Sequence, residues 1–105
     1  MKVVIESPYA GDIDKNLNYA RACMKDSLNR GEYPLASHLL YTQMLDDRIK
    51  EERELGMRAG LVWALKSDKA VFYADLGYSK GMLEAKKYYK KHNIDIEERF
   101  LWKSL

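Results

Sequence analysis

The stretch KVVIESPYAGD, residues 2–12, decides the fold expected for this chain. Its first part, Lys2–Glu6, is a β-branched run typical of a buried strand, and residues 7–12 are mostly turn-formers. This order predicts a strand that leaves its sheet through a loop. Residues 13–30 then place apolar side chains at helical spacing, so a helix follows the loop.

The same alternation of strand and helix continues along the chain. Parallel strands need a crossover connection, which these helices provide. We therefore expect a three-layer α/β/α sandwich around a four-stranded, mainly parallel sheet, Rossmann-like or flavodoxin-like, with the first and third strands central and the last at an edge. The further elements predicted are a short strand running into a loop at 33–40, strands at 69–75 and 94–102, an irregular segment at 41–48, and helices at 49–66 and 80–91.

The composition is that of one folded domain. The 105 residues are 47% hydrophobic and 32% charged, so residues 1–105 are treated as a single domain. The apolar run at 61–65 is far shorter than the roughly 20 residues of a membrane helix, and no signal peptide precedes the first strand. We expect a cytoplasmic protein with no membrane partner. The net charge of +2 is too small for general electrostatic binding to long nucleic acid, so a nucleotide partner would be small.

The cysteine and histidine positions favour neither a disulfide nor a metal site. Cys23 is the one cysteine of the sequence, and His38 and His92 are far apart along the chain. We therefore expect no metal and no cofactor.

Function is expected where the strands end, because ligands of open α/β sheets bind outside the carboxyl ends of the strands. Ser7, Tyr9 and Gly11 directly precede a helix N-terminus, which favours a phosphate or a polar sugar edge. The alternative is that this loop only forms a turn and a helix cap. His38 and Tyr41 follow the second strand, where they would hydrogen-bond or stack on a nucleobase, unless the histidine is only structural.

Two carboxylates belong to the third strand and the helix after it. Asp75 closes the apolar strand, and Glu84 lies in the second turn of the helix for which Ser79 is a natural N-cap. If both faced one pocket, one would act as a nucleophile and the other as a proton donor, as in retaining glycosyl transfer. The alternative is that Glu84 is a surface residue paired with Lys80 or Lys87.

Two glycines of the second long helix bear on assembly. Gly56 and Gly60 permit close approach, either to the sheet or to another subunit, and the apolar segment 60–65 follows them. A chain of this size leaves much apolar surface exposed, so we expect a homo-oligomer whose subunits help to close one another's pockets.

Several motifs together carry a family resemblance. They are SPYAGD at 7–12, Asn16, SHLLY at 37–41, ERELGMRAG at 52–60 and DLGYSKGMLEA at 75–85. This set resembles the small, often phage-encoded branch of the nucleoside 2-deoxyribosyltransferase-like superfamily, over nearly the whole chain.

The resemblance implies an N-glycosidic reaction. By it, Glu84 would be the nucleophile at C1′, Asp75 would hold or protonate the base, and residues 7–12 would hold the sugar-phosphate side. The positions expected around the ligand are Ser7, Pro8, Tyr9, Gly11, Asp12, Asn16, His38, Tyr41, Gly77, Ser79 and Gly81.

Three functions remain open at this point. The first is an enzyme that cleaves or transfers the N-glycosidic bond of a nucleoside, a nucleoside monophosphate or an ADP-ribose-like molecule. The second is a phage-type protein that sequesters a nucleotide-derived host signal, ADP-ribose-like or cyclic, in an anti-defence role in the host cytoplasm. The third is an interaction protein without a small ligand.

Overall fold

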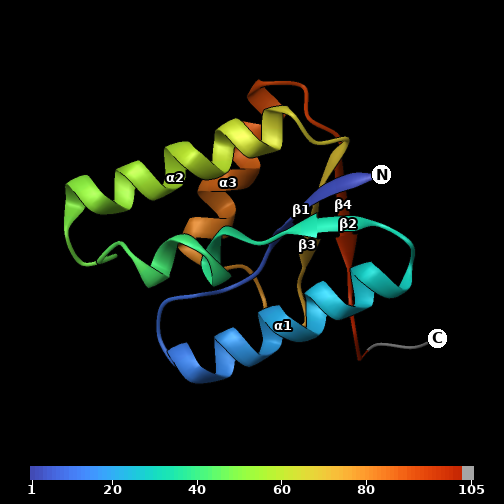
Figure 1. The fold of residues 1–105 in the computed structure, drawn as a ribbon, viewed down its shortest axis with the longest axis horizontal. Coiled ribbons are helices and arrows are strands. Elements are labelled where there is room, and N and C mark those ends of the chain that lie inside the picture. The colour runs from blue at the N-terminus through green and yellow to red at the C-terminus, as the bar shows by residue number, and fades with distance from the viewer. Residues whose placement is uncertain (103–105) are drawn as a thin grey trace.

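The computed structural model describes residues 1–102 and holds in this range a four-stranded sheet with helices on both faces (Figure 1). The elements in chain order are β1 (Lys2–Glu6), α1 (Ile13–Asn29), β2 (Tyr33–Leu35), the short 3-10 turns η1 (Ser37–Leu39) and η2 (Tyr41–Gln43), α2 (Lys50–Leu65), β3 (Lys69–Tyr73), α3 (Lys80–Lys91) and β4 (Ile96–Arg99).

The sheet is parallel throughout and has the order β2-β1-β3-β4. The prediction of a parallel sheet with β1 and β3 in the centre is therefore confirmed. Helix α1 covers one face and α2 and α3 cover the other, which makes the three-layer α/β/α sandwich (Figure 1). The order reverses direction between β1 and β3, so their carboxyl ends form the position where such sheets bind ligands.

The two faces of the sheet have separate apolar cores. Alternate residues of a strand point to opposite faces, so Val3 and Ile5 pack with Tyr19 and Cys23 of α1. Val4 lies on the other face, in a cluster with Phe72, Met82 and Tyr89 among others. Cys23 is fully buried in the α1-side core. Each helix is therefore held by burial against its own face of the sheet.

The second predicted strand is short and leads into turns. The sequence predicts a short strand running into a loop over 33–40, and the structure has β2 end at Leu35, after which the chain turns through η1 and η2. The turn bonds run from Leu39 N to Ala36 O and from Leu40 N to Ser37 O. A short apolar run can form either a strand or a turn, and here the residues after Leu35 form turns that contact α2.

The last strands are also trimmed at their ends. The strand predicted over 69–75 stops at Tyr73, and the one predicted over 94–102 is limited to Ile96–Arg99. Asn93 adopts a positive φ of 58° after α3, and the residues just before β4 belong to this turn and not to the strand. The placement of β4 at an edge is confirmed.

Gly56 and Gly60 allow α2 to pack closely against the η1–η2 segment. A Cβ added at Gly56 would lie 3.3 Å from Leu45 Cδ1, and one added at Gly60 would lie 3.6 Å from Ser37 Oγ. Both glycines therefore face the η1–η2 segment of the same subunit and not the sheet. Within residues 1–102, no helix has the length and apolarity that crossing a bilayer requires.

Candidate functional site

The loop after β1 is held by its own side chains. Ser7 and Pro8 are buried, and Asn16 of α1 donates from its side-chain amide to the carbonyls of Tyr9 (2.9 Å) and Ala10 (3.0 Å). Asp12 is the N-cap of α1 and accepts from Lys15 N at 3.2 Å. Asn16 thus satisfies two carbonyls of the loop, and Asp12 satisfies an amide of the first turn of α1.

Gly11 has a φ of 99°, in the left-handed region that favours glycine. No atom lies within 4 Å of a Cβ added there, so backbone conformation rather than space requires glycine. A larger residue at this position would strain the loop even if it touched no ligand.

His38 joins the end of β1 to the η1–η2 segment. Its imidazole hydrogen-bonds to the backbone of Ser7, and its ring centroid lies 5.6 Å from that of Tyr9. Burial lowers the pKa of His38, an effect opposed by the charge of Asp47 and by the bond to Ser7. The structure thus brings Ser7, Tyr9 and His38 together at the carboxyl end of the sheet, and favours a neutral imidazole there.

A small groove lies beside His38, between the η1–η2 segment and α2; we call it the η groove. It has a volume of about 90 Å³, and its walls include His38, Tyr41, Asp47, Glu52 and Arg53. The Tyr41 hydroxyl accepts from the Trp63 indole N–H at 2.7 Å, which fixes the tyrosine ring on α2.

A wider groove of about 480 Å³ lies between α2 and α3 and contains Glu84; we call it the α2–α3 groove. Glu84 is exposed at its wall. The other residues that line it are Arg53, Glu54, Met57, Lys87, Tyr88 and Lys91. Arg53 and Met57 line both grooves, so the N-terminal half of α2 separates the two and is shared by them.

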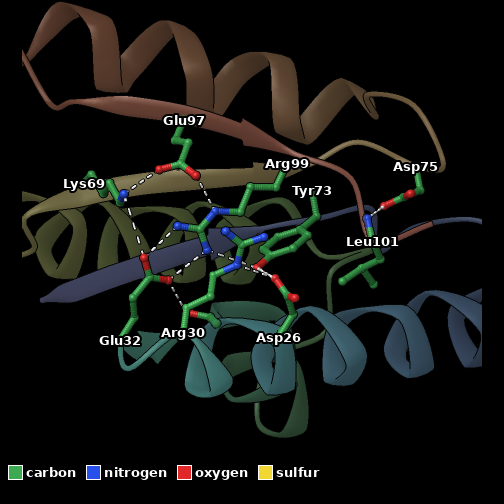
Figure 2. A network of polar contacts seen from close by, with 10 residues as sticks. Asp26, Arg30, Glu32, Lys69, Tyr73, Asp75, Glu97, Arg99 and Leu101 are labelled. Atoms are coloured by element: carbon green, nitrogen blue, oxygen red, sulfur yellow. Dashed lines mark hydrogen bonds and ion pairs between the residues drawn. The ribbon is translucent and has the colours of Figure 1, made fainter. Parts of the chain in front are cut away.

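Asp75 does not join Glu84 in this groove. Its carboxylate accepts from Tyr19 Oη (2.6 Å), Leu101 N (2.8 Å) and Trp102 N (3.0 Å), on the α1 side of the sheet (Figure 2 shows the bond to Leu101). Partial burial alone would raise the pKa of Asp75, but these hydrogen bonds outweigh it and lower the pKa. The expectation that Asp75 and Glu84 face one pocket is therefore wrong, and Asp75 secures the segment after β4.

The remaining predicted positions lie in the turn before α3. Ser79 caps the helix by accepting from Met82 N at 3.2 Å, which confirms it as the N-cap. Gly77 has a φ of 82°, so the turn requires glycine. A Cβ added at Gly81 would meet Ser79 Oγ at an ordinary 3.9 Å, so the fold itself does not require glycine there. Neither groove includes these three residues among its lining.

Sequence reasoning missed Glu6, the last residue of β1. Its side chain is 8% exposed and accepts a hydrogen bond from Tyr89 Oη at 2.6 Å. Burial raises the pKa of Glu6 to about 7, although the bond from Tyr89 lowers it. The signal available was a charged residue closing an apolar strand, which is the same signal that singled out Asp75.

A second buried polar cluster lies on the α1 side of β3 and β4 (Figure 2). Arg99 pairs with Glu32 (Nη2 to Oε2, 2.6 Å) and with Glu97, and Lys69 also pairs with Glu97. Hydrogen bonds from Arg99 are the main cause that lowers the pKa of Glu32 and of Glu97 to about 2 each. We call these four residues the Arg99 network. Their charges neutralise one another, which indicates a structural role.

Metal binding gains no support from the geometry. Over residues 1–102, no three His, Cys, Asp or Glu side chains gather in a way that could hold an ion.

The comparisons with known proteins give one match. A family model described as a domain of unknown function, DUF7768, matches residues 1–99. Searches of the curated proteins and of the solved structures return no match. The matched range runs from β1 through the end of β4 and takes in both grooves. The chain therefore belongs to the DUF7768 family of domains of unknown function.

Proposed function

We propose that this protein binds a nucleoside or nucleotide in the α2–α3 groove and that Glu84 attacks C1′ of the ligand's sugar. The observation that carries the proposal is that Glu84 shares this groove with three cationic side chains and a tyrosine ring. The volume of about 480 Å³ lies within the roughly 300–1,000 Å³ typical of small-molecule sites. The motif resemblance to nucleoside 2-deoxyribosyltransferase-like proteins supports the choice of C1′.

The charges of the groove suit a phosphorylated ligand. Arg53, Lys87 and Lys91 are hydrogen-bond donors that carry positive charge, and phosphate oxygens are the acceptors that such donors bind best. Tyr88 is 47% exposed, so its ring can stack on a base without unpacking the core. The ligand would thus place its phosphate against the cations and its base against the tyrosine.

The proposed reaction needs a nucleophile and a proton donor. A bond forms between a Glu84 carboxylate oxygen and C1′ while the C1′–N bond breaks, and the base leaves with that electron pair and takes a proton. We assign the proton to Glu54, which lines the same groove, because the Asp75 carboxylate is held on the α1 side. In the second step water or a second base attacks C1′, loses a proton to the Glu54 carboxylate and breaks the Glu84–C1′ bond; water gives the free sugar, and a second base gives a new nucleoside.

A second candidate is capture of a nucleotide signal, ADP-ribose-like or cyclic, without turnover. It is favoured by the exposure of Glu84 and by the loss of Asp75 as a partner, since covalent glycosyl chemistry works best where water is excluded. In either case we expect the ligand to be met in the cytoplasm, that of the host if the protein is phage-encoded.

The experiment compares wild type with Glu84→Gln on nucleosides, nucleoside monophosphates, cyclic nucleotides and ADP-ribose. Free base is measured by chromatography and affinity by calorimetry. Because Gln keeps the shape but is no nucleophile, we expect base release to be lost and affinity to stay within about tenfold, or about 1.4 kcal/mol. Asp14→Asn, which removes an exposed carboxylate from α1, is the control and should change neither measurement.

The lysines provide a second, independent readout. Lys91→Gln should weaken phosphorylated ligands and leave nucleosides unchanged, whereas Lys90→Gln, an exposed neighbour outside the groove lining, should change neither. If wild type releases no base but yields intact ligand on heating, capture replaces catalysis. If no ligand in the panel binds, or if Glu84→Gln turns over at the wild-type rate, the proposed function is wrong.

A further inference from the structure

Helix α2 directs more large apolar side chains to solvent than to the core. Its one buried residue is Ala64, whereas Leu55, Val62 and Leu65 are 51%, 55% and 47% exposed. A surface helix normally turns its apolar stripe inward and its charges outward. A contiguous apolar stripe on the solvent side of a helix marks a contact surface.

Two of these exposed residues, Leu55 and Val62, form a line along the helix together with Ala59, which is half-buried. Leu55, Ala59 and Val62 follow one another at i, i+4 and i+7, which places them on one side of α2. Glu51 and Lys66 extend this line by one turn at each end, and both are exposed. We call these five residues the outer face of α2.

The side of α2 opposite this line is occupied within the subunit. Gly56 and Gly60 pack on the η1–η2 segment, and Arg53 and Met57 line the grooves. Ala64 is fully buried in the core that includes Val4 and Phe72. The outer face thus points away from the sheet and from both grooves, so the proposed ligand does not explain its apolar character.

We propose that the outer face binds a second copy of this chain, with the two α2 helices antiparallel across a two-fold axis. The charge pattern identifies the occupant. Glu51 and Lys66 lie equally far from the midpoint between Arg58 and Ala59, and so do Leu55 and Val62. An antiparallel pair centred on that midpoint places Glu51 opposite Lys66 of the partner subunit, twice by symmetry, and Leu55 opposite Val62 of the partner subunit.

The arrangement is self-complementary in size as well as charge. Ala59 lies next to the axis, where a small side chain lets two helices approach closely. A parallel pair would instead place Glu51 against Glu51 and Lys66 against Lys66, which like-charge repulsion disfavours. The same sequence pattern therefore favours one orientation and disfavours the other.

The test is the mass of the full chain in solution, by sedimentation equilibrium at tens of micromolar. We expect a dimer for wild type and a monomer for Val62→Asp, because a carboxylate would be desolvated in the apolar centre. Leu83→Asp is the matched control: Leu83 lies on α3, outside the outer face, and is 56% exposed against 55% for Val62. It should remain dimeric, and circular dichroism should show all variants folded.

A charge-reversal cycle tests the orientation. Glu51→Lys and Lys66→Glu should each weaken the dimer by about tenfold or more, and the double variant should recover most of the loss. Both positions are exposed, so neither variant disturbs the core. A monomeric wild type, a dimer that survives Val62→Asp, or a double variant as weak as the two single ones would overturn the proposal.

Discussion

Glu6 and Arg99 are both charged residues buried against the sheet, one on each face, but they are satisfied in different ways. Arg99 is 6% exposed and is paired with Glu32 and Glu97, so its charge is balanced where it lies. Glu6 is 8% exposed, and in the described part of the chain the side chain bonded to its carboxylate is the neutral Tyr89 hydroxyl. Burial alone therefore does not decide whether a buried side chain keeps its charge. The charge of its hydrogen-bonding partner decides this.

The difference assigns different roles to the two faces. The Arg99 network joins β3, β4 and the turn before β2, so it ties together segments that are far apart in sequence. Glu6 instead holds a carboxyl that titrates near neutrality, at the carboxyl end of a central strand. The first arrangement stabilises the fold at ordinary pH, and the second makes stability depend on pH.

The largest effect is expected from removing the cation of the network. Arg99→Met leaves Glu32 and Glu97 near each other without their main partner, and breaking a buried pair in this way costs about 3–5 kcal/mol. The measurement is the free energy of unfolding in urea. Arg30→Met, which removes a surface pair with Asp26, should cost less than about 1 kcal/mol. Equal losses for the two variants would contradict the contrast between buried and exposed pairs.

The second-largest effect is a gain in stability when Glu6, on the opposite face of the sheet, is replaced by Gln. The pKa of Glu6 is raised from 4.5 to about 7 on folding, so its favourable contribution is complete below pH 4.5 and is lost as the pH rises through 7. A shift of this size corresponds to about 3 kcal/mol. Glu6→Gln stays neutral and can still accept from Tyr89, so it should be more stable than wild type at pH 8 and nearly equal to it at pH 4.5.

Urea unfolding of both proteins at several pH values checks this expectation. The gap between variant and wild type should widen from pH 4.5 to about pH 7 and level off above it. A constant gap over that range would mean that Glu6 does not titrate there. Asp14→Asn, which removes an exposed carboxylate of α1, should leave the pH profile of wild type unchanged.

The smallest effect is expected from replacing Glu97, the outer member of the network. The pKa of Glu97 is lowered on folding to about 2, so its contribution is present above pH 4.5 and is lost as the pH falls towards 2. Its side chain is 37% exposed, so Glu97→Gln should cost only about 0.5–1 kcal/mol at pH 7. The cost should shrink as the pH is lowered towards 2, and a cost that stays constant would argue against ion pairing.

The fold was predictable because its signals are local. Lys2–Glu6 and Lys69–Tyr73 are nearly continuous apolar runs bounded by turn residues, and a parallel sheet follows once helices separate them. The end of β2 was not predictable in this way. The contacts that accompany the turn there, between Gly60 and Ser37 and between Gly56 and Leu45, join segments that the sequence does not show as neighbours.

The site was predictable only in part, for a related reason. The sequence places Asp75 and Glu84 after the same strand, but the direction of each side chain depends on loop conformation and on distant donors. The Tyr19 hydroxyl, 56 residues away, turns the Asp75 carboxylate towards α1. The burial of Glu6 likewise depends on Tyr89, 83 residues away. His38 and Tyr9 were predicted at one end of the sheet, and the structure does bring them together.

The rate at which Cys23 reacts with a thiol reagent can report how often the α1 layer opens. It is the one cysteine of the sequence, it is fully buried, and burial raises its pKa to about 12, so the closed protein offers a thiol reagent almost no reactive thiolate. Labelling can proceed only during moments when α1 lifts from β1 and β3. The labelling rate at increasing urea therefore measures how often this one layer opens, separately from the layer that carries α2 and α3.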